Sequence, residues 1–176
     1  KVRTQLKIKK VENTAIERHP VPVLGKDYRV KIIYKNIKIA ELDVEDSTIK
    51  ISLPNKYKKD DNKKILDLAI DKMYEEIAKV EVENAMEKFR IMLGFAPEDY
   101  RITKFMKGFG KCENNKITIN SQIVKYDRKV VEYVVLHEVC HLKHMNHSKQ
   151  FWQMVEGYMP DYKKYKKELN SSKYDR

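Results

Sequence analysis

Apolar and polar residues alternate along much of the first third of the chain, which is the pattern of half-buried β-strands. Three segments follow it, at residues 28–34, 38–44 and 48–53. In the last segment, the apolar residues Ile49, Ile51 and Leu53 fall on one face. Turn-forming residues separate the segments, and Pro20 and Pro22 are expected to break up the chain before the first one. Residues 1–58 are therefore predicted to form a small antiparallel β-rich region.

A helical period replaces this alternation over residues 62–93. Its apolar stripe begins with Leu66, Ala69, Ile70, Met73, Ile77 and Val80 and continues with Ala85, Met86, Phe89 and Leu93. Gly94 is placed to end this helix, because glycine readily adopts the left-handed conformation of a helix C-terminus. A helix of this length is expected to act as a scaffold for a second region, residues 59–176.

The second region mixes short strands with helices. Residues 101–106 and 116–120 are predicted to be the two strands of a β-hairpin, joined by a segment rich in glycine and asparagine. Asp127 is placed to cap a largely apolar helix, and Ser148 to cap another, after which a short basic helix follows. The predicted fold class is therefore α+β.

The apolar helix carries the sequence His137-Glu-Val-Cys-His141, which has the form of a metal site. Residues four apart on a helix are separated by about 40° and one turn, so both imidazoles face the same way. Two such imidazoles can bind one zinc ion (Zn²⁺), and the adjacent Glu138 can act as the general base of a hydrolase. With five histidines in 176 residues, chance produces this pattern in about one such chain in a hundred.

A catalytic zinc ion needs a third protein ligand and an open position for water. If the helix continued, His144 would share the face of His137 but would lie roughly 10 Å further along the axis. His147 reaches the same ion if the helix breaks between Leu142 and Asn146, since asparagine tolerates the left-handed conformation. Its offset of ten residues from His137 equals the first-to-third spacing of metzincin-type motifs. We expect His147 to be the third ligand, with His144 and a distant carboxylate such as Glu156 as alternatives.

The overall composition limits where such an enzyme acts. The net charge is +11, carried by 30 Lys and 7 Arg spread along the chain. Scattered lysine favours a solvated surface, whereas recognition of phosphate groups favours arginine, so nucleic acid is kept only as an alternative partner. No apolar run is long enough for a membrane span. Cys112 and Cys140 are too few for a disulfide framework, and we expect reduced thiols, a cytoplasmic location and a monomer.

Several stretches resemble the YgjP-like zinc metallopeptidase family, which is related to SprT-like and WLM proteases. The metal motif of the family corresponds to His137-Glu-Val-Cys-His141. Two stretches near it are also similar, since Phe109-Gly-Lys-Cys112 resembles Trp-Gly-Ser-Cys, and Asn146-His147-Ser148 with Phe151-Trp152 resembles Asn-His-Ser-x-x-Phe-Trp. Near the N-terminus, Leu24-Gly-Lys-Asp-Tyr28 resembles the family's Leu-Gly-x-x-Tyr. The resemblance implies a minimal zincin-like core of the gluzincin type, in which the third ligand falls on His147. The departures, Phe109 for Trp and Lys111 for Ser, lie in the expected hairpin and bear on substrate preference rather than on metal binding.

Four functions are compatible with this site. The first is hydrolysis of a peptide bond, with an extended substrate paired to the edge of the strand at 101–106. The second is metal-dependent pyrophosphatase activity on a nucleotide, which the resemblance also implies and which requires a cation such as Lys104 or Lys143 near the metal. The third is a DNA-associated, SprT-like protease recruited by a basic surface. The fourth is a structural zinc site, disfavoured because three histidines beside a glutamate form an open-site pattern.

Overall fold

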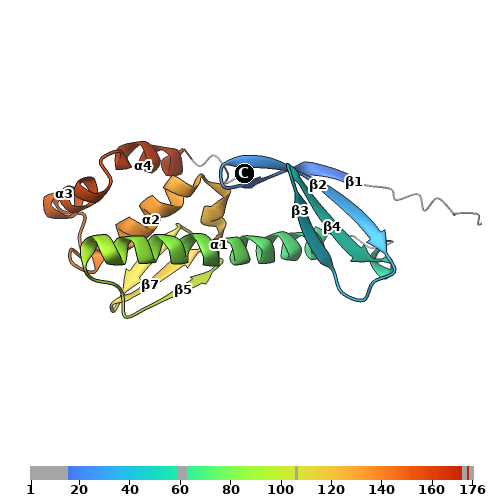
Figure 1. Cartoon of the computed structure of the whole chain (residues 1–176), viewed down its shortest axis with the longest axis horizontal. Helices are drawn as coiled ribbons and strands as arrows, with labels where there is room; N and C mark the ends of the chain where they lie inside the picture. The colour runs from blue at the N-terminus through green and yellow to red at the C-terminus, as the bar shows by residue number, and fades with distance from the viewer. Residues whose placement is uncertain (1–15, 59–62, 106, 172–173, 175–176) are drawn as a thin grey trace, which may run out of the picture.

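The computed structural model describes residues 16–58, 63–105, 107–171 and 174, with side chains from residue 20 onward. It is an α+β fold, as predicted, in which the long helix α1 (Lys63–Leu93) runs from an N-terminal sheet to a group of helices and a second sheet (Figure 1). The N-terminal sheet contains β1 (Ile16–Val23), β2 (Lys26–Lys35), β3 (Glu41–Glu45) and β4 (Thr48–Pro54). A short 3₁₀ turn, η1 (Asn55–Tyr57), follows β4.

The N-terminal sheet is mixed rather than antiparallel, which corrects the prediction for this region. Its strand order is β1-β2-β4-β3, and β2 and β4 run parallel. The physical reason lies in β4, where Ile49, Ile51 and Leu53 are fully buried. A central position buries this strand between two neighbours, whereas the mostly exposed β3 takes the edge.

The chain before Tyr28 also differs from the prediction, because the segment with two prolines forms a strand. Strand β1 lies at an edge of the sheet, where proline's missing N–H is tolerated, and its pairing with β2 is irregular between Arg18 and Val21. The carbonyl of Pro22 accepts a 2.9 Å hydrogen bond from the Tyr74 hydroxyl of α1. The proline segment thus ties the N-terminal sheet to the long helix.

Helix α1 matches the predicted range of 62–93 within one residue, and Gly94 follows it with φ of 78°. One predicted stripe position is wrong, since the side chain of Val80 is 58% exposed. The buried face instead comprises Leu66, Met73, Tyr74, Ala78, Glu81, Val82, Ala85, Met86 and Phe89. The buried residues Tyr74, Ala78, Val82, Ala85 and Phe89 follow one another at spacings of three and four, and Val80 falls between two of them on another side of the helix.

The second sheet contains β5 (Asp99–Thr103), β6 (Gly110–Glu113) and β7 (Lys116–Asn120), in the order β5-β7-β6. The predicted hairpin was wrong in its first strand. Strand β6 is the hairpin partner of β7, through Asn114 and Asn115 with φ of 49° and 60°, while β5 pairs with β7 in parallel. The expected connecting segment itself contains β6, and Met106, the predicted end of the first strand, lies outside the described residues.

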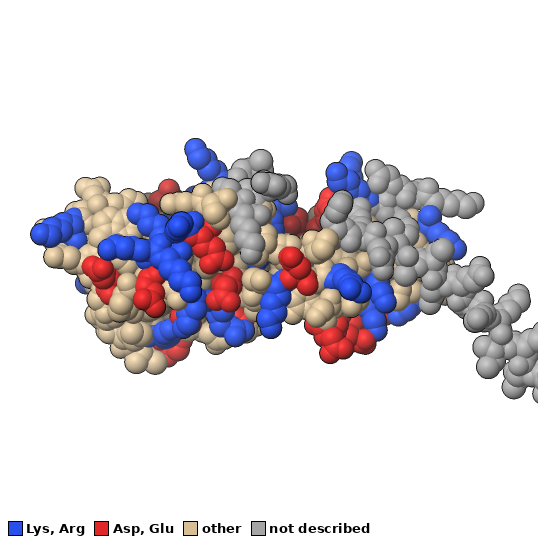
Figure 2. Space-filling view, turned by 90° about the horizontal axis from the view of Figure 1, so that it is seen from above, with Lys and Arg blue, Asp and Glu red and all other residues tan. Residues whose placement is uncertain are grey.

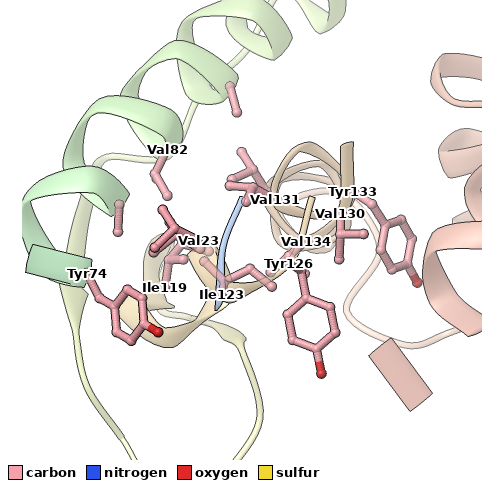
Figure 3. Packing of buried hydrophobic residues seen from close by; sticks show 14 of the residues in the cluster. Val23, Tyr74, Val82, Ile119, Ile123, Tyr126, Val130, Val131, Tyr133 and Val134 are labelled. Atoms are coloured by element: carbon pink, nitrogen blue, oxygen red, sulfur yellow. The ribbon is translucent and has the colours of Figure 1, made fainter. Parts of the chain in front are cut away.

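The remaining elements are η2 (Ser121–Lys125), α2 (Arg128–His141), α3 (Lys149–Tyr158) and α4 (Tyr162–Asn170). Both predicted caps are present, because the Asp127 side chain accepts from the Lys129 amide and the Ser148 hydroxyl accepts from the Phe151 amide. Helix α2 is buried among β7, η2 and α1. Figure 3 shows its valines Val130, Val131 and Val134 with Ile119 and Ile123, and with Val82 of α1.

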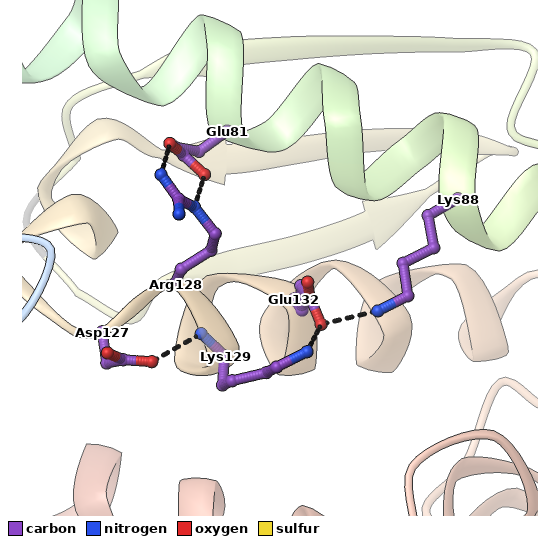
Figure 4. Close-up of polar contacts among 6 residues, drawn as sticks. All are labelled: Glu81, Lys88, Asp127, Arg128, Lys129 and Glu132. Atoms are coloured by element: carbon purple, nitrogen blue, oxygen red, sulfur yellow. Dashed lines mark hydrogen bonds and ion pairs between the residues drawn. The ribbon is translucent and has the colours of Figure 1, made fainter.

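Two ion-pair groups on one side of α2 fix it against α1 (Figure 4). The Arg128 guanidinium donates to both carboxylate oxygens of Glu81 at 2.6 and 2.7 Å. About one turn further along α2, the Glu132 carboxylate accepts from Lys88 at 2.8 Å and from Lys129 at 3.0 Å. Paired, two-point contacts of this kind resist both sliding and rotation of α2, so the metal-binding end of this helix has a defined position.

Candidate metal centre

Helix α2 ends at His141, immediately after the second histidine of the motif. Leu142 caps it, and the amides of Lys143 and His144 both donate to the Cys140 carbonyl. The predicted break is therefore present. The expectation that Asn146 supplies a left-handed turn was wrong, because no residue from 142 to 148 has a positive φ.

The turn after α2 brings His147 back to His137 and His141. The three Nε2 atoms lie 3.2, 3.2 and 2.9 Å apart. Nitrogen ligands held 2.0–2.1 Å from a tetrahedral zinc ion would lie about 3.3 Å from one another. The three nitrogen atoms are therefore spaced as the ligands of one zinc ion would be. Within the described ranges, His137, His141 and His147 are the side chains whose metal-ligating atoms come together in a group of three.

Neighbouring groups hold these imidazoles in a ligating orientation. The Nδ1 atom of His141 donates to the His144 carbonyl oxygen at 2.9 Å, which leaves the lone pair of Nε2 directed into the group. The fully buried ring of Phe151 contacts all three imidazoles, with ring centroids 4.5 Å from His141 and 4.9 Å from both His137 and His147. Phe151 thus packs in the core behind the three imidazoles.

The electrostatic environment also favours neutral imidazoles. Burial, followed by the neighbouring His141 and His147, lowers the pKa of His137 to about 3. Burial and the neighbouring His141 lower the pKa of the more exposed His147 as well. Only the neutral form of imidazole offers a lone pair to a metal, so both residues are ready to bind one at neutral pH. Because His147 leaves one side of the group open to solvent, water or substrate has access.

Glu138 lies beside this group and is 6% exposed. Burial raises the pKa of its carboxyl to about 7, and a cation on the three histidines would oppose that effect and favour the carboxylate. The carboxylate lines a cavity of about 500 Å³, together with His137, Tyr133 and Val134 of α2. The cavity is closed on one side by Gly108, Phe109 and Gly110, and on the other by Leu169 and Asn170 of α4.

Two groups that help to build the site were not predicted from the sequence. One is the His144 carbonyl, a backbone group that residue types do not reveal. The other is Gly110, where a Cβ atom would lie 2.6 Å from the Glu138 Oε1. The glycine in the stretch Phe109-Gly-Lys-Cys112 is a signal for such a close approach, although the sequence does not say which residue approaches.

The alternative residues lie elsewhere. Glu156 is exposed and pairs with Lys163, and the imidazole of His144 lies outside the converging group. Lys104 binds Asp71 at 2.7 Å, and Lys143 lies over the ring of Phe95, so neither lysine lines the cavity beside Glu138. Both cysteines are free thiols, and Cys140 is fully buried in α2 as expected.

An open three-histidine group beside a buried glutamate, at the end of a helix packed on a small sheet, is the arrangement typical of a metallopeptidase. The model of the YgjP-like metallopeptidase domain matches residues 1–172, and the chain belongs to this family. No helix in the described part of the chain is both long and apolar enough to cross a membrane.

The solved structures that are similar to the chain include two metallopeptidase zymogens. One is the metallopeptidase zymogen of Pyrococcus abyssi abylysin, with 24% identity and a TM-score of 0.48 over 54% of this chain and 96% of that one. The other is the metallopeptidase zymogen of Methanocaldococcus jannaschii jannalysin, with 16% identity and a TM-score of 0.47 over 53% of this chain and 90% of that one. No curated protein sequence matches the chain.

Proposed function

We propose that the protein hydrolyses peptide bonds with zinc as its metal, held by His137, His141 and His147, and with Glu138 as the general base. The observation that carries the proposal is the convergence of three Nε2 atoms, 2.9–3.2 Å apart, beside a buried carboxylate at the wall of an open cavity. A structural zinc site would be closed by a fourth protein ligand, and no fourth donor converges on these atoms among the described residues.

Glu138 supplies the proton transfers of the reaction. When bound, the zinc ion would lower the pKa of the attacking water and polarise the scissile carbonyl. The Glu138 carboxylate accepts the proton of that water as it attacks, and then delivers the proton to the leaving amide nitrogen. Burial raises the pKa of this carboxyl and a bound cation would lower it, and these opposing effects suit a group that must both accept and release a proton.

The strand that binds an extended substrate is β6 rather than the segment at 101–106. Strands β5 and β6 are the two edges of the sheet, but Gly110 at the start of β6 lies against Glu138, whereas β5 is on the far side of β7. A peptide added antiparallel to β6 runs from the Glu113 end towards the Gly110 end. The part after the cleaved bond then reaches the cavity lined by Phe109 and Val134.

The test compares zinc-loaded wild type with Glu138→Gln on a library of quenched fluorescent peptides. Wild type is expected to cleave peptides, and Glu138→Gln to keep one zinc ion per chain while losing about 10²–10⁴-fold in kcat/KM. Glu156→Gln is the matched control. It removes an exposed carboxylate that lies outside the three-histidine group, so this variant should retain both zinc and activity.

The same preparations are tested on a panel of nucleoside triphosphates. Hydrolysis of a triphosphate without any peptide cleavage would overturn the proposal in favour of a pyrophosphatase. Binding to DNA that weakens steeply with salt, measured separately, would show whether the net charge of +11 recruits the enzyme to nucleoprotein.

A further inference from the structure

Helix α4 carries four lysines, and one of them faces inward. Lys163, Lys164 and Lys167 are exposed, as expected of a solvated basic helix. Lys166 is half-buried and lies nearer the inner side of the helix, four residues after the buried Tyr162 and three before Leu169, which lines the cavity beside Glu138. Residues at this spacing share one side of a helix. Figure 2 shows the basic side chains gathered over the α4 region.

The half-buried side chain of Lys166 lies over an aromatic stack that ends at the metal ligands. Its ammonium is 3.9 Å from the centroid of the Trp152 ring. That indole stacks on His147 with centroids 5.5 Å apart. Lys166 has no carboxylate partner among the described residues, so a partly desolvated cation faces the site without an anion.

The hollow beside Lys166 adjoins the cavity at Glu138, since Asn170 lines both. It measures about 320 Å³ and is lined by Tyr162, Lys163, Lys166, Lys167 and Asn170. The two are therefore neighbours along one wall formed by α4. A side chain of a substrate seated between β6 and α4 can therefore reach this hollow while its backbone stays beside Glu138.

We propose that the hollow on α4 is a binding site for an acidic side chain of the peptide substrate, and that Lys166 is the residue that determines this specificity. The inference rests on the proposed peptidase function and names its substrate class. An aspartate or glutamate carboxylate pairs with the inward ammonium, and Lys163 and Lys167 at the rim add attraction as the substrate approaches. Lys166 contacts the substrate away from the bond that is cleaved.

A carboxylate fits this site better than a polyphosphate or a nucleic acid backbone. Of the three lysines that line the hollow, Lys163 and Lys167 are exposed at its rim and Lys166 alone is half-buried, and a lysine presents a single point of charge. Phosphate groups are usually held by several converging donors or by the fork of an arginine, and the hollow is lined by no arginine. A single carboxylate matches a single inward ammonium beside an indole ring.

The first test measures kcat/KM for peptide pairs that differ only by Asp or Asn, or by Glu or Gln, at each position near the cleaved bond. At one position the acidic peptide is expected to be favoured about fivefold by wild type, as for a partly exposed ion pair. Lys166→Met should remove this preference and Lys166→Glu should reverse it in favour of a basic side chain. Lys164→Met, with the same charge change on the exposed face, should leave the preference unchanged.

Two results would overturn the inference while leaving the peptidase function intact. One is cleavage without any preference for acidic side chains. The other is an equal loss of kcat on acidic and amide peptides in Lys166→Met, which would place Lys166 at the reacting carbonyl instead.

The second test does not depend on cleavage. Trp152 is the single tryptophan of the chain, and it lies directly under Lys166. In zinc-loaded Glu138→Gln, the acidic member of a peptide pair should change the tryptophan fluorescence and bind about fivefold more tightly than its amide counterpart. Lys166→Met in the same background should equalise the two affinities. Equal affinities before that substitution would contradict the inference even if no peptide were ever cleaved.

Discussion

Replacing Gly110 with alanine should remove most of the peptidase activity while leaving zinc binding intact. An added Cβ would lie 2.6, 2.7 and 2.8 Å from the Oε1, Cγ and Cδ atoms of Glu138. Ordinary contacts begin at 3.4 Å, so Oε1 and the new methyl group have to separate by about 0.8 Å. Either the carboxylate retreats or the start of β6 moves, and both changes alter the distance between the base and the substrate strand.

The expected effect on catalysis is large and the expected effect on stability is moderate. A misplacement of about 1 Å in a catalytic group can cost about 100-fold in rate, and a loss of this size in kcat/KM is expected. Gly110 does not have a positive φ, so alanine fits its backbone. The atoms that must give way include Cγ and Cδ of the buried Glu138 side chain, so this overlap should lower the free energy of unfolding by about 1–3 kcal/mol.

The assay combines peptide cleavage, metal analysis and chemical unfolding on the same preparation. Gly157→Ala is the matched control, because a Cβ at this position of α3 meets nothing within 4 Å. That control should keep wild-type activity and zinc. Full activity in Gly110→Ala would refute the reasoning that this contact places Glu138, and loss of zinc would show that the strand supports the ligands as well.

Three further predictions concern the ligands, the loop and the helix contact. His147→Ala should lose tightly bound zinc on dialysis, measured by metal analysis, whereas His144→Ala should retain it because the carbonyl that orients His141 belongs to the backbone. Asn120 is buried and donates to two loop carbonyls ahead of β6, so Asn120→Ala should lower the free energy of unfolding by about 2–3 kcal/mol. Burial raises the pKa of Glu132, but bonds from two lysines outweigh it and hold the pKa below its usual 4.5. Its stabilisation is present above that value and is lost as the pH falls through the lowered pKa. Glu132→Gln should therefore be less stable by about 1 kcal/mol at pH 7 in urea unfolding, and the difference should shrink between pH 5 and pH 3.

The elements predicted well are those determined by local pattern. Helix α1 and its terminating Gly94, the cap at Asp127 and the cap at Ser148 all depend on residues within a few positions of one another. The convergence of His147 with His137 also has a local basis, since ten residues and one broken helix limit where its side chain can reach.

The strand partners were predicted less well, because alternation identifies a strand but not its neighbour. The parallel pairing of β2 with β4, and of β5 with β7, joins segments that are not adjacent in the chain. Burial of the most apolar strands decides these pairings, and it depends on the whole core. The strand β6 was hidden inside a segment whose glycines and asparagines indicate only turns.

The sequence alone determined the chemistry of this protein: two imidazoles one helical turn apart, a third within reach, and a carboxylate beside them. Only the tertiary structure decided that Gly110 of β6 presses against Glu138 and that Lys166 of α4 lies over Trp152 next to the ligands. Spacing along the chain sets the direction of side chains within one helix, so it describes the metal site. Contacts between β6, α2 and α4 arise when separate elements pack, and these contacts shape the space that the substrate occupies.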